Sequence, residues 1–194
     1  YPYVTSSSAA AGGACTGLGV SPTKISSVIG IVKAYTTRVG EGPFPTEIND
    51  SLGEKIREKG GEYGATTGRP RRCGWLDMVA LRYAARVNGF SGIVLTKLDI
   101  LDGLEKIKIC TAYRFEGKLY EEFPKELNIL EKCEPVYEEV SGWKENTGGV
   151  KSFEKLPSAA QAYIKDIERR LNVKVKIISS GQKRDELIMR GEIF

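Results

Sequence analysis

Seven consecutive residues hold the side chains of this 194-residue chain that are best suited to binding a small anion. Two threonines, a glycine and three arginines lie together in the order Thr66-Thr67-Gly68-Arg69-Pro70-Arg71-Arg72. Each guanidinium presents a planar fork that can bind a carboxylate or a phosphate with two charge-assisted hydrogen bonds. The hydroxyls add neutral donors that would fix the orientation of such a ligand. The segment therefore predicts a receptor for carboxylates or phosphates.

This Arg loop, residues 66–72, also has simpler interpretations. A basic run is usually a solvated surface, and Gly-Arg-Pro is the core of arms that bind the minor groove of DNA. A solvated arm would not need the apolar run that follows directly, Cys73-Gly74-Trp75-Leu76. We therefore expect the loop to be anchored to a core. Apolar residues recur at helical spacing from residue 76 to residue 87, which predicts that the loop lies at a helix N-terminus, where free amides favour anions.

Two further motifs each come directly after a predicted strand. Lys97-Leu98-Asp99 comes directly after a continuous apolar run over residues 93–96, and ligands of open α/β sheets bind at this end of the strands. The carboxylate of Asp99 could accept hydrogen bonds from both N1–H and the amino group of guanine. The simpler interpretation is a surface ion pair between Lys97 and Asp99, which is the more common role of such residues at a strand end. Ser179-Ser180-Gly181 follows the predicted strand 173–178, and by itself it is most often a turn.

The order and spacing of these motifs resemble the adenylosuccinate synthetase family, the ligases that join aspartate to IMP at the expense of GTP. The substrate loop of that family reads Thr-Thr-Gly-Arg-x-Arg-Arg, followed by Gly-Trp and an acidic residue, and every one of those positions is matched here. The stretches 1–7, 33–40, 42–47 and 95–99 agree as well. The resemblance implies the C-terminal half of the family, because the Gly-rich phosphate loop and the catalytic Asp and His of the N-terminal half are not found. The start at Tyr1 agrees with a fragment.

The resemblance implies roles for individual residues, each carried over by position. The aspartate and IMP site would comprise Thr5, Val39, Ala65, Thr66, Thr67, Gly68, Arg69, Pro70 and Arg71. GTP would contact Arg71, Lys97, Leu98, Asp99, Ser179, Ser180 and Gly181. No catalytic residue and no metal ligand are expected in this chain, and Mg²⁺ would be bound mainly by the missing half. The chain departs from the family pattern at two places. The family usually has Pro and an acidic residue where this chain has Gln182-Lys183, and Asn where it has Ser8.

The elements that must position these motifs indicate an α/β fold with a mostly parallel sheet and flanking helices. The resemblance adds a P-loop-NTPase-like architecture, with residues 1–194 as the C-terminal half of one domain. We expect strands at 93–96, 106–113, 136–140 and 173–178, and helices at 22–40, 52–59, 76–87 and 157–171. Residues 40–46 are predicted to form a shaped loop. The Ser-, Ala- and Gly-rich opening, 5–19, is expected to be ordered backbone that contacts substrate, anchored by Tyr1 and Tyr3.

Composition limits the class of protein. The chain has 29 Lys and Arg residues against 25 Asp and Glu residues, a net charge of +4 that suits anionic small molecules as well as nucleic acid. The four cysteines lie far apart without a Cys-x-x-Cys pair, which favours reduced thiols in the cytoplasm over a zinc site or disulfides. No apolar run approaches the roughly 20 residues that cross a bilayer, and no signal peptide is found. There is no histidine, so we expect the isolated chain to bind rather than to catalyse.

The leading hypothesis is therefore part of a GTP-dependent IMP–aspartate ligase, the enzyme of the first committed step of AMP biosynthesis. The resemblance implies a homodimer that binds neither nucleic acid nor membranes. One alternative is a non-catalytic module that binds nucleic acid or nucleotides through the Arg loop. Another is a regulatory GTP-binding protein, which is weakened because no Gly-x-x-x-x-Gly-Lys-Ser/Thr loop is found in the sequence.

Overall fold

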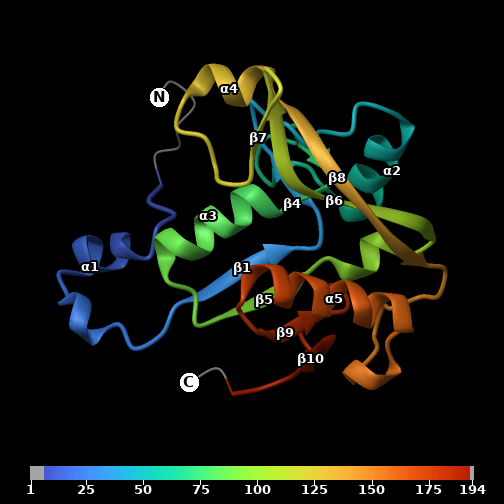
Figure 1. Cartoon of the computed structure of the whole chain (residues 1–194). Coiled ribbons are helices and arrows are strands. Elements are labelled where there is room, and N and C mark those ends of the chain that lie inside the picture. The colour runs from blue at the N-terminus through green and yellow to red at the C-terminus, as the bar shows by residue number, and fades with distance from the viewer. Residues whose placement is uncertain (1–6, 193–194) are drawn as a thin grey trace.

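The computed structural model describes residues 7–192, in which helices and strands alternate along the chain (Figure 1). The elements are α1 (Gly12–Leu18), η1 (Pro22–Lys24), β1 (Ile29–Lys33), β2 (Thr36–Arg38), α2 (Ser51–Gly60), β3 (Arg72–Gly74), β4 (Leu76–Asp77), α3 (Met78–Asn88), β5 (Gly92–Thr96), η2 (Leu98–Leu101), β6 (Leu104–Phe115), β7 (Lys118–Tyr120), α4 (Leu127–Lys132), β8 (Glu134–Trp143), η3 (Phe153–Lys155), α5 (Ser158–Leu171), β9 (Val175–Ser179) and β10 (Leu187–Met189).

A parallel sheet carries the two predicted nucleotide motifs. Its strand order is β1-β5-β9-β10, with β1, β5 and β9 parallel and β10 antiparallel at one edge. Ile93 and Leu95 of β5 are completely buried, which agrees with the apolar run that predicted this strand. The α/β class and the strands after which Lys97 and Gly181 occur are thus confirmed.

A second sheet is mostly antiparallel, so the prediction of a mostly parallel sheet holds only for the first. Strands β6 and β8 form a long antiparallel ribbon, β7 pairs antiparallel with the last residues of β6, and β4 is parallel to β6 (Figure 1). Glu116 and Gly117 both have positive φ and join β6 to β7 as a two-residue hairpin loop. The hairpin, α4 and β10 were not predicted from the sequence.

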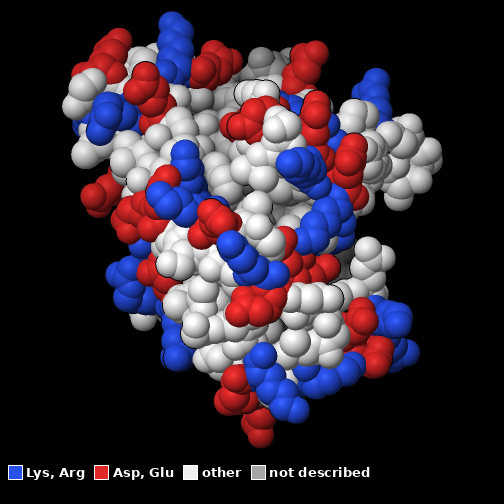
Figure 2. Space-filling view, turned by 90° about the vertical axis from the view of Figure 1, so that its right-hand side faces the viewer, with Lys and Arg blue, Asp and Glu red and all other residues white. Residues whose placement is uncertain are grey.

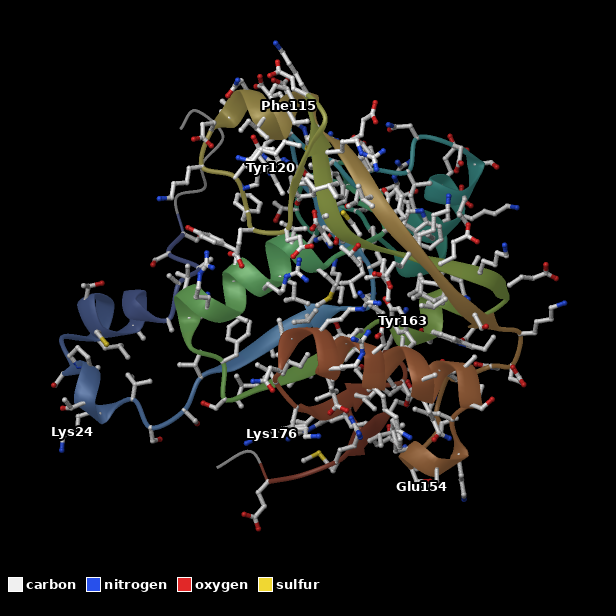
Figure 3. All side chains as sticks on the ribbon, in the orientation of Figure 1. Lys24, Phe115, Tyr120, Glu154, Tyr163 and Lys176 are labelled. Carbon is white, nitrogen blue, oxygen red and sulfur yellow. The ribbon has the colours of Figure 1, made fainter. Side chains whose placement is uncertain are left out.

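One apolar core joins both sheets to α5. It includes Leu95 of β5, Ile107 of β6 and Ile164 of α5. Tyr163 of α5 is buried (Figure 3), and its hydroxyl donates to the carbonyl of Ala34, just after β1, at 2.6 Å. This bond fixes α5 against the end of β1. In the described part of the chain, no helix is both long and apolar enough to cross a membrane.

The helix predicted over residues 22–40 is wrong. Ser21 does cap a helical turn, accepting from the N–H of Thr23 at 3.4 Å, but that turn ends at Lys24. Strands β1 and β2 occupy most of the remaining residues. The β-branched side chains Ile29, Ile31 and Val32 suit a strand, and pairing of β1 with β5 prevails over an apolar spacing that also fits a helix.

The Ser-, Ala- and Gly-rich opening contains a short helix, α1. Helix α1 has no buried residue, and the N–H of Ala11 just before it donates to the side chain of Asn88 at 2.7 Å. Tyr1 and Tyr3, the proposed anchors, lie outside the described residues. The other predicted helices, at 52–59, 76–87 and 157–171, agree with α2, α3 and α5 to within two residues at each end.

Helix α2 is held against the preceding loop with little free space. Asp50 caps it by accepting from the N–H groups of Leu52 at 2.8 Å and Gly53 at 3.4 Å. A Cβ on Gly53 would overlap the carbonyl oxygen of Ile48. The helix ends at Gly60, and Gly61 has a φ of 59°, which turns the chain towards the Arg loop.

We expect Gly53→Ala to lower the free energy of unfolding by about 1–3 kcal/mol, because the new methyl group collides with backbone that cannot move aside. Alanine favours a helix over glycine by about 0.8–1.0 kcal/mol, so the overlap must outweigh this gain. Urea denaturation followed by circular dichroism measures the change. The control is Gly12→Ala in α1, where the methyl would meet no other atom. Equal stability of the two variants would contradict the packing described here.

Candidate functional site

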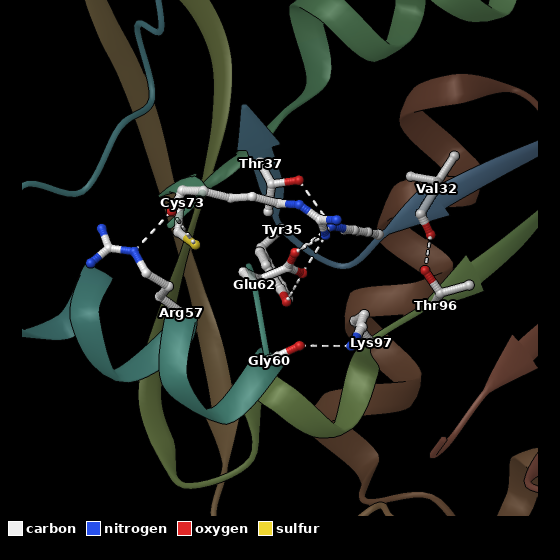
Figure 4. A network of polar contacts seen from close by, with 11 residues as sticks. Val32, Tyr35, Thr37, Arg57, Gly60, Glu62, Cys73, Thr96 and Lys97 are labelled. Carbon is white, nitrogen blue, oxygen red and sulfur yellow. Dashed lines mark hydrogen bonds and ion pairs between the residues drawn. The ribbon is translucent and has the colours of Figure 1, made fainter. Parts of the chain in front are cut away.

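A buried carboxylate lies at the centre of the candidate site (Figure 4). Both oxygens of Glu62 accept from Lys33 Nζ at 2.8 Å, and one of them accepts from the hydroxyl of Tyr35 at 2.6 Å. The other accepts from Nη1 of Arg71 at 2.7 Å. Lys33 also donates to Oγ1 of Thr37 at 2.9 Å. The network brings the end of β1, the β1–β2 corner and the Arg loop to one point.

The surroundings of Glu62 keep it ionised. Burial alone would raise the pKa of Glu62, but hydrogen bonds from Lys33, Tyr35 and Arg71 outweigh burial and lower that pKa. Burial, followed by the bond to Glu62, raises the pKa of Tyr35, which therefore stays a neutral donor. Glu62 was not predicted as a site residue. Lys33 and Tyr35 were not either, although both lie in a stretch that agrees with the family, residues 33–40.

The Arg loop is an ordered turn, as its apolar flank predicted. The N–H of Gly64 donates to the carbonyl of Arg69, and the N–H of Gly68 donates to the carbonyl of Gly64, both at 2.8 Å. Gly68 has a φ of 64°, a conformation that glycine adopts without strain. The hydroxyl of Thr67 accepts from the N–H of Arg69 at 3.3 Å. Residues 65–70 are exposed, so the turn presents its side chains to solvent.

The three arginines of the loop differ in their partners. Arg71 is bound to Glu62, and Arg72 forms a two-bond ion pair with Glu47 and also donates to the carbonyl of Gly42 at 2.8 Å. In contrast, the Arg69 guanidinium has no hydrogen bond or ion pair with any residue between 7 and 192. Arg72 is thus structural, and Arg69 is the guanidinium available to an external anion.

The prediction that the Arg loop lies at a helix N-terminus is wrong. Strands β3 and β4 separate Arg71 from α3, and β3 pairs with β2. The first turn of α3 is capped by its own Asp77, which accepts from the N–H of Ala80 at 3.0 Å and from the hydroxyl of Tyr113 at 2.5 Å. The free N–H groups at the N-terminus of α3 therefore face Asp77 and not the anion site.

The two predicted guanine motifs lie together on one cavity of about 430 Å³. Its lining residues are Gly60, Gly61, Thr96, Lys97, Asp99, Ser179, Gly181 and Gln182. Three of the residues predicted to contact GTP do not line it: Arg71, Leu98 and Ser180. Leu98 is buried in the core, and the buried hydroxyl of Ser180 donates to the carbonyl of Val150 at 2.9 Å.

Lys97 and Asp99 are not paired with each other, which removes the simpler interpretation of this motif. Lys97 has a φ of 62°, and its Nζ donates to the carbonyl of Gly60 at 2.8 Å. This turns the lysine towards α2 and leaves the Asp99 carboxylate on the cavity wall. Burial raises the pKa of Asp99, so a ligand that donates to this carboxylate would favour its charged form.

Glu186 forms the hydrogen bonds that hold together residues 180–186, the loop that departs from the family pattern. Its carboxylate accepts from the N–H of Lys183 at 2.8 Å, and its backbone carbonyl accepts from the N–H of Ser180 at 3.0 Å. A Cβ on Gly181 would overlap the Glu186 carboxylate, so a larger residue there would displace that side chain. The loop thus obtains an acidic group from Glu186, although Gln182 and Lys183 lack one.

The remaining predictions concern Val39, Thr5 and metal binding. Val39 lies just after β2 and is 63% exposed, so its side chain is accessible to a ligand. Thr5 lies outside the described residues. Between residues 7 and 192, no three His, Cys, Asp or Glu side chains are grouped so that they could hold a metal ion. Basic and acidic side chains are interspersed on the face in Figure 2, with no continuous basic patch there.

Comparison with known proteins identifies one family. A family model described as adenylosuccinate synthetase matches residues 1–188. The adenylosuccinate synthetase of Thermodesulfovibrio yellowstonii is 69% identical over 190 residues, which are 98% of this chain and 45% of that protein. The enzyme of Clostridium novyi is 57% identical over 193 residues, again 45% of its length. The chain therefore spans less than half the length of these relatives.

Two solved structures share the fold. The structure of fully ligated adenylosuccinate synthetase from Plasmodium falciparum has a TM-score of 0.94 and 47% identity, and covers 98% of this chain and 46% of that one. Succinoaminodeoxyadenylate synthetase of cyanophage S-2L, bound to dGMP and to dATP as an energy donor, has a TM-score of 0.55. At 17% identity, the second likeness concerns the fold alone.

We expect Glu186→Ala to loosen the loop at residues 180–186. The change removes the acceptor for the N–H of Lys183, worth about 0.5–1.5 kcal/mol, so amide hydrogen exchange across the loop should quicken by roughly two- to tenfold. Hydrogen exchange followed by mass spectrometry measures this. Asp185→Ala is the matched control, because Asp185 makes only an exposed pair with Lys151, and it should leave these rates nearly unchanged. Unchanged exchange in Glu186→Ala would show that the carboxylate does not order the loop.

Proposed function

The chain belongs to the adenylosuccinate synthetase family, and we propose that it forms part of an enzyme that ligates L-aspartate to IMP with GTP. The products are adenylosuccinate, GDP and phosphate. One observation carries the proposal: an anion receptor, in which Arg69 has no partner among residues 7–192, and a cavity lined by Asp99 are joined by the short segment 60–62. An enzyme that brings an acidic substrate to a guanine nucleotide requires both parts.

We propose that this chain is the C-terminal half of that enzyme. The guanine and Arg-loop motifs are here, whereas a phosphate-cradling loop and a histidine are not found in its sequence. The other half would supply the phosphate loop and the catalytic Asp and His. Mg²⁺ would be held mainly there as well, because the described residues offer no suitable cluster. A homodimer in the cytoplasm is part of the same proposal.

In this proposal, the Arg loop binds the carboxylates of aspartate. Arg69 and Arg71 supply guanidinium forks, and Thr66 and Thr67 add hydroxyl donors. Arg69 would also reach the inosine nucleotide, and Arg71 would reach GTP. The exposure of residues 65–70 supports access by a ligand, and the bond to Glu62 supports a fixed position for Arg71.

The chemistry assigned to this chain is positioning and electrostatic stabilisation. The hypoxanthine oxygen of IMP takes a phosphoryl group from GTP and becomes a leaving group, and the aspartate amine then displaces phosphate. Holding the amine and the activated base together removes much of the entropic cost of this second step. Cations near the transferred phosphoryl group stabilise its developing charge, which is the main demand of phosphoryl transfer.

Asp99 is the proposed reader of guanine. Its oxygens would accept from N1–H and from the exocyclic amine, donors that adenine does not present together. The cyanophage protein shares the fold and is bound to dATP as an energy donor, so the fold by itself does not select the base. Base preference in this chain must then come from particular side chains on the cavity wall.

A nucleic-acid module is the less favoured candidate. Two of the three Arg-loop guanidiniums are bound to carboxylates, which leaves few free charges for a phosphate backbone. Assaying the full-length protein with IMP, aspartate and GTP tests both proposals. Formation of adenylosuccinate supports the ligase, whereas DNA binding with a steep salt dependence and no ligation would favour the module.

We expect Arg69→Leu in the full-length enzyme to abolish useful turnover without unfolding the protein, with the aspartate KM affected first. The change removes a charged hydrogen-bond donor worth about 1.5–3 kcal/mol. Steady-state kinetics and a melting temperature check this. Arg86→Leu is the control, because Arg86 pairs with Glu122 on the surface and should not alter aspartate use. Unchanged aspartate kinetics in a folded Arg69→Leu protein would refute the assignment.

We expect Asp99→Asn to shift nucleotide preference from GTP towards XTP. Asparagine keeps one acceptor for N1–H, but its amide donor opposes the exocyclic amine of guanine and suits the carbonyl of xanthine. The loss for GTP should be about 1.5–3 kcal/mol, roughly tenfold to a hundredfold in affinity. IMP and aspartate constants should change little. An unaltered ratio of GTP to XTP use would mean that Asp99 does not read the base.

A further inference from the structure

The segment from Gly60 to Glu62 belongs to both parts of the site. Glu62 holds Lys33 and Arg71, while the carbonyl of Gly60 accepts from Lys97 Nζ at 2.8 Å (Figure 4). Gly60 and Gly61 also line the cavity that carries Asp99. Three consecutive residues thus connect the Arg loop with the proposed guanine site.

Glu62 does not cancel the charge of its partners. Lys33 and Arg71 bring two positive charges against one negative charge, so the cluster keeps a net charge of one. The side chains of Lys33 and Arg71 remain 28% and 31% exposed, whereas that of Glu62 is 1% exposed. The carboxylate therefore lies behind the two cations and fixes where their exposed parts point. Such an arrangement suits an external anion on the open side.

Close packing joins Gly60 to the same network. A Cβ on Gly60 would overlap the hydroxyl of Tyr35, and this hydroxyl donates to Glu62 at 2.6 Å. The backbone of Gly60 and the carboxylate of Glu62 are therefore both set against one buried ring. Because packed interiors deform little, a displacement of Gly60 moves the Tyr35 hydroxyl and with it the acceptor of the cations.

We propose that Glu62 is a positioning residue of the ligation reaction, and that residues 60–62 link the guanine cavity to Lys33 and Arg71. This rests on the proposed function and deepens it. A nucleotide in the cavity holds Lys97 and Gly60 in place, which holds Glu62 and orients the two cations towards the acidic substrate. Guanine-nucleotide and aspartate binding then strengthen each other, as linkage between two sites requires.

The test uses the full-length protein with Glu62→Gln and measures kcat, the aspartate KM and the dissociation constant of GDP by calorimetry. A glutamine amide must direct its NH₂ at a donor, so we expect the aspartate KM and the GDP constant each to rise about tenfold or more. A merely structural glutamate would lower the melting temperature or the active fraction, and hence kcat, and leave both constants unchanged. Glu47→Gln is the matched control, because it weakens the Arg72 ion pair without touching the cavity.

A second variant applies if Glu62→Gln fails to fold. Gly60→Ala should raise the GDP constant and the aspartate KM together, each about fivefold or more, because the new methyl group displaces the Tyr35 hydroxyl that donates to Glu62. Wild-type constants in folded Glu62→Gln, or a Gly60→Ala variant in which the GDP constant rises and the aspartate KM does not, would overturn the inference. If the wild-type protein binds GDP but makes no adenylosuccinate, the proposed function fails, and the GDP measurements still decide whether residues 60–62 form the link.

Discussion

A carboxylate removed from water is the constraint on which the site depends. An isolated buried charge is strongly unfavourable, so Glu62 must be met by donors from every side. Those donors come from β1, from the β1–β2 corner and from the Arg loop, parts of the chain that the pairing of β2 with β3 also holds together. The bond from Arg71 both stabilises the ionised form of Glu62 and fixes the position of the Arg loop. The loop keeps its exposed conformation because its base is tied to a group that cannot be left unpaired.

The cavity beside Asp99 is built differently, from the ends of helices and strands rather than from a network of ion pairs. Thr96 ends β5, Ser179 ends β9, and Gly60 ends α2, so each wall is the point where a regular element stops. Parallel strands place their carboxyl ends at one edge, which explains why two distant motifs share a cavity. Lys97 adopts a left-handed conformation directly after β5, and its bond to Gly60 ties the strand edge to the helix end.

The sequence predicted the parts of this site that depend on local residue type. Apolar runs located β5 and β9, and the clustered arginines located the loop. It did not reveal Glu62, because a single glutamate in a Gly-rich stretch carries no signal of burial until its partners are known. The helix expected over residues 22–40 failed for a related reason: β1 exists through its pairing with β5, some sixty residues away, and local spacing does not report that contact. The separation of Arg71 from α3 likewise depends on pairing between β2 and β3.

The two sheets should also form at different rates during folding. Strands β6 and β7 are joined by two residues and can close as a hairpin within microseconds. The parallel sheet has no such local route, since Ile29 lies opposite Gly92, and Ile93 lies opposite Val175. Contacts of long sequence separation form late, because the entropy of closing the intervening loops opposes them. Until β9 arrives, the apolar run of β5 stays uncovered, so chaperone binding or self-association during refolding should centre on residues 92–96.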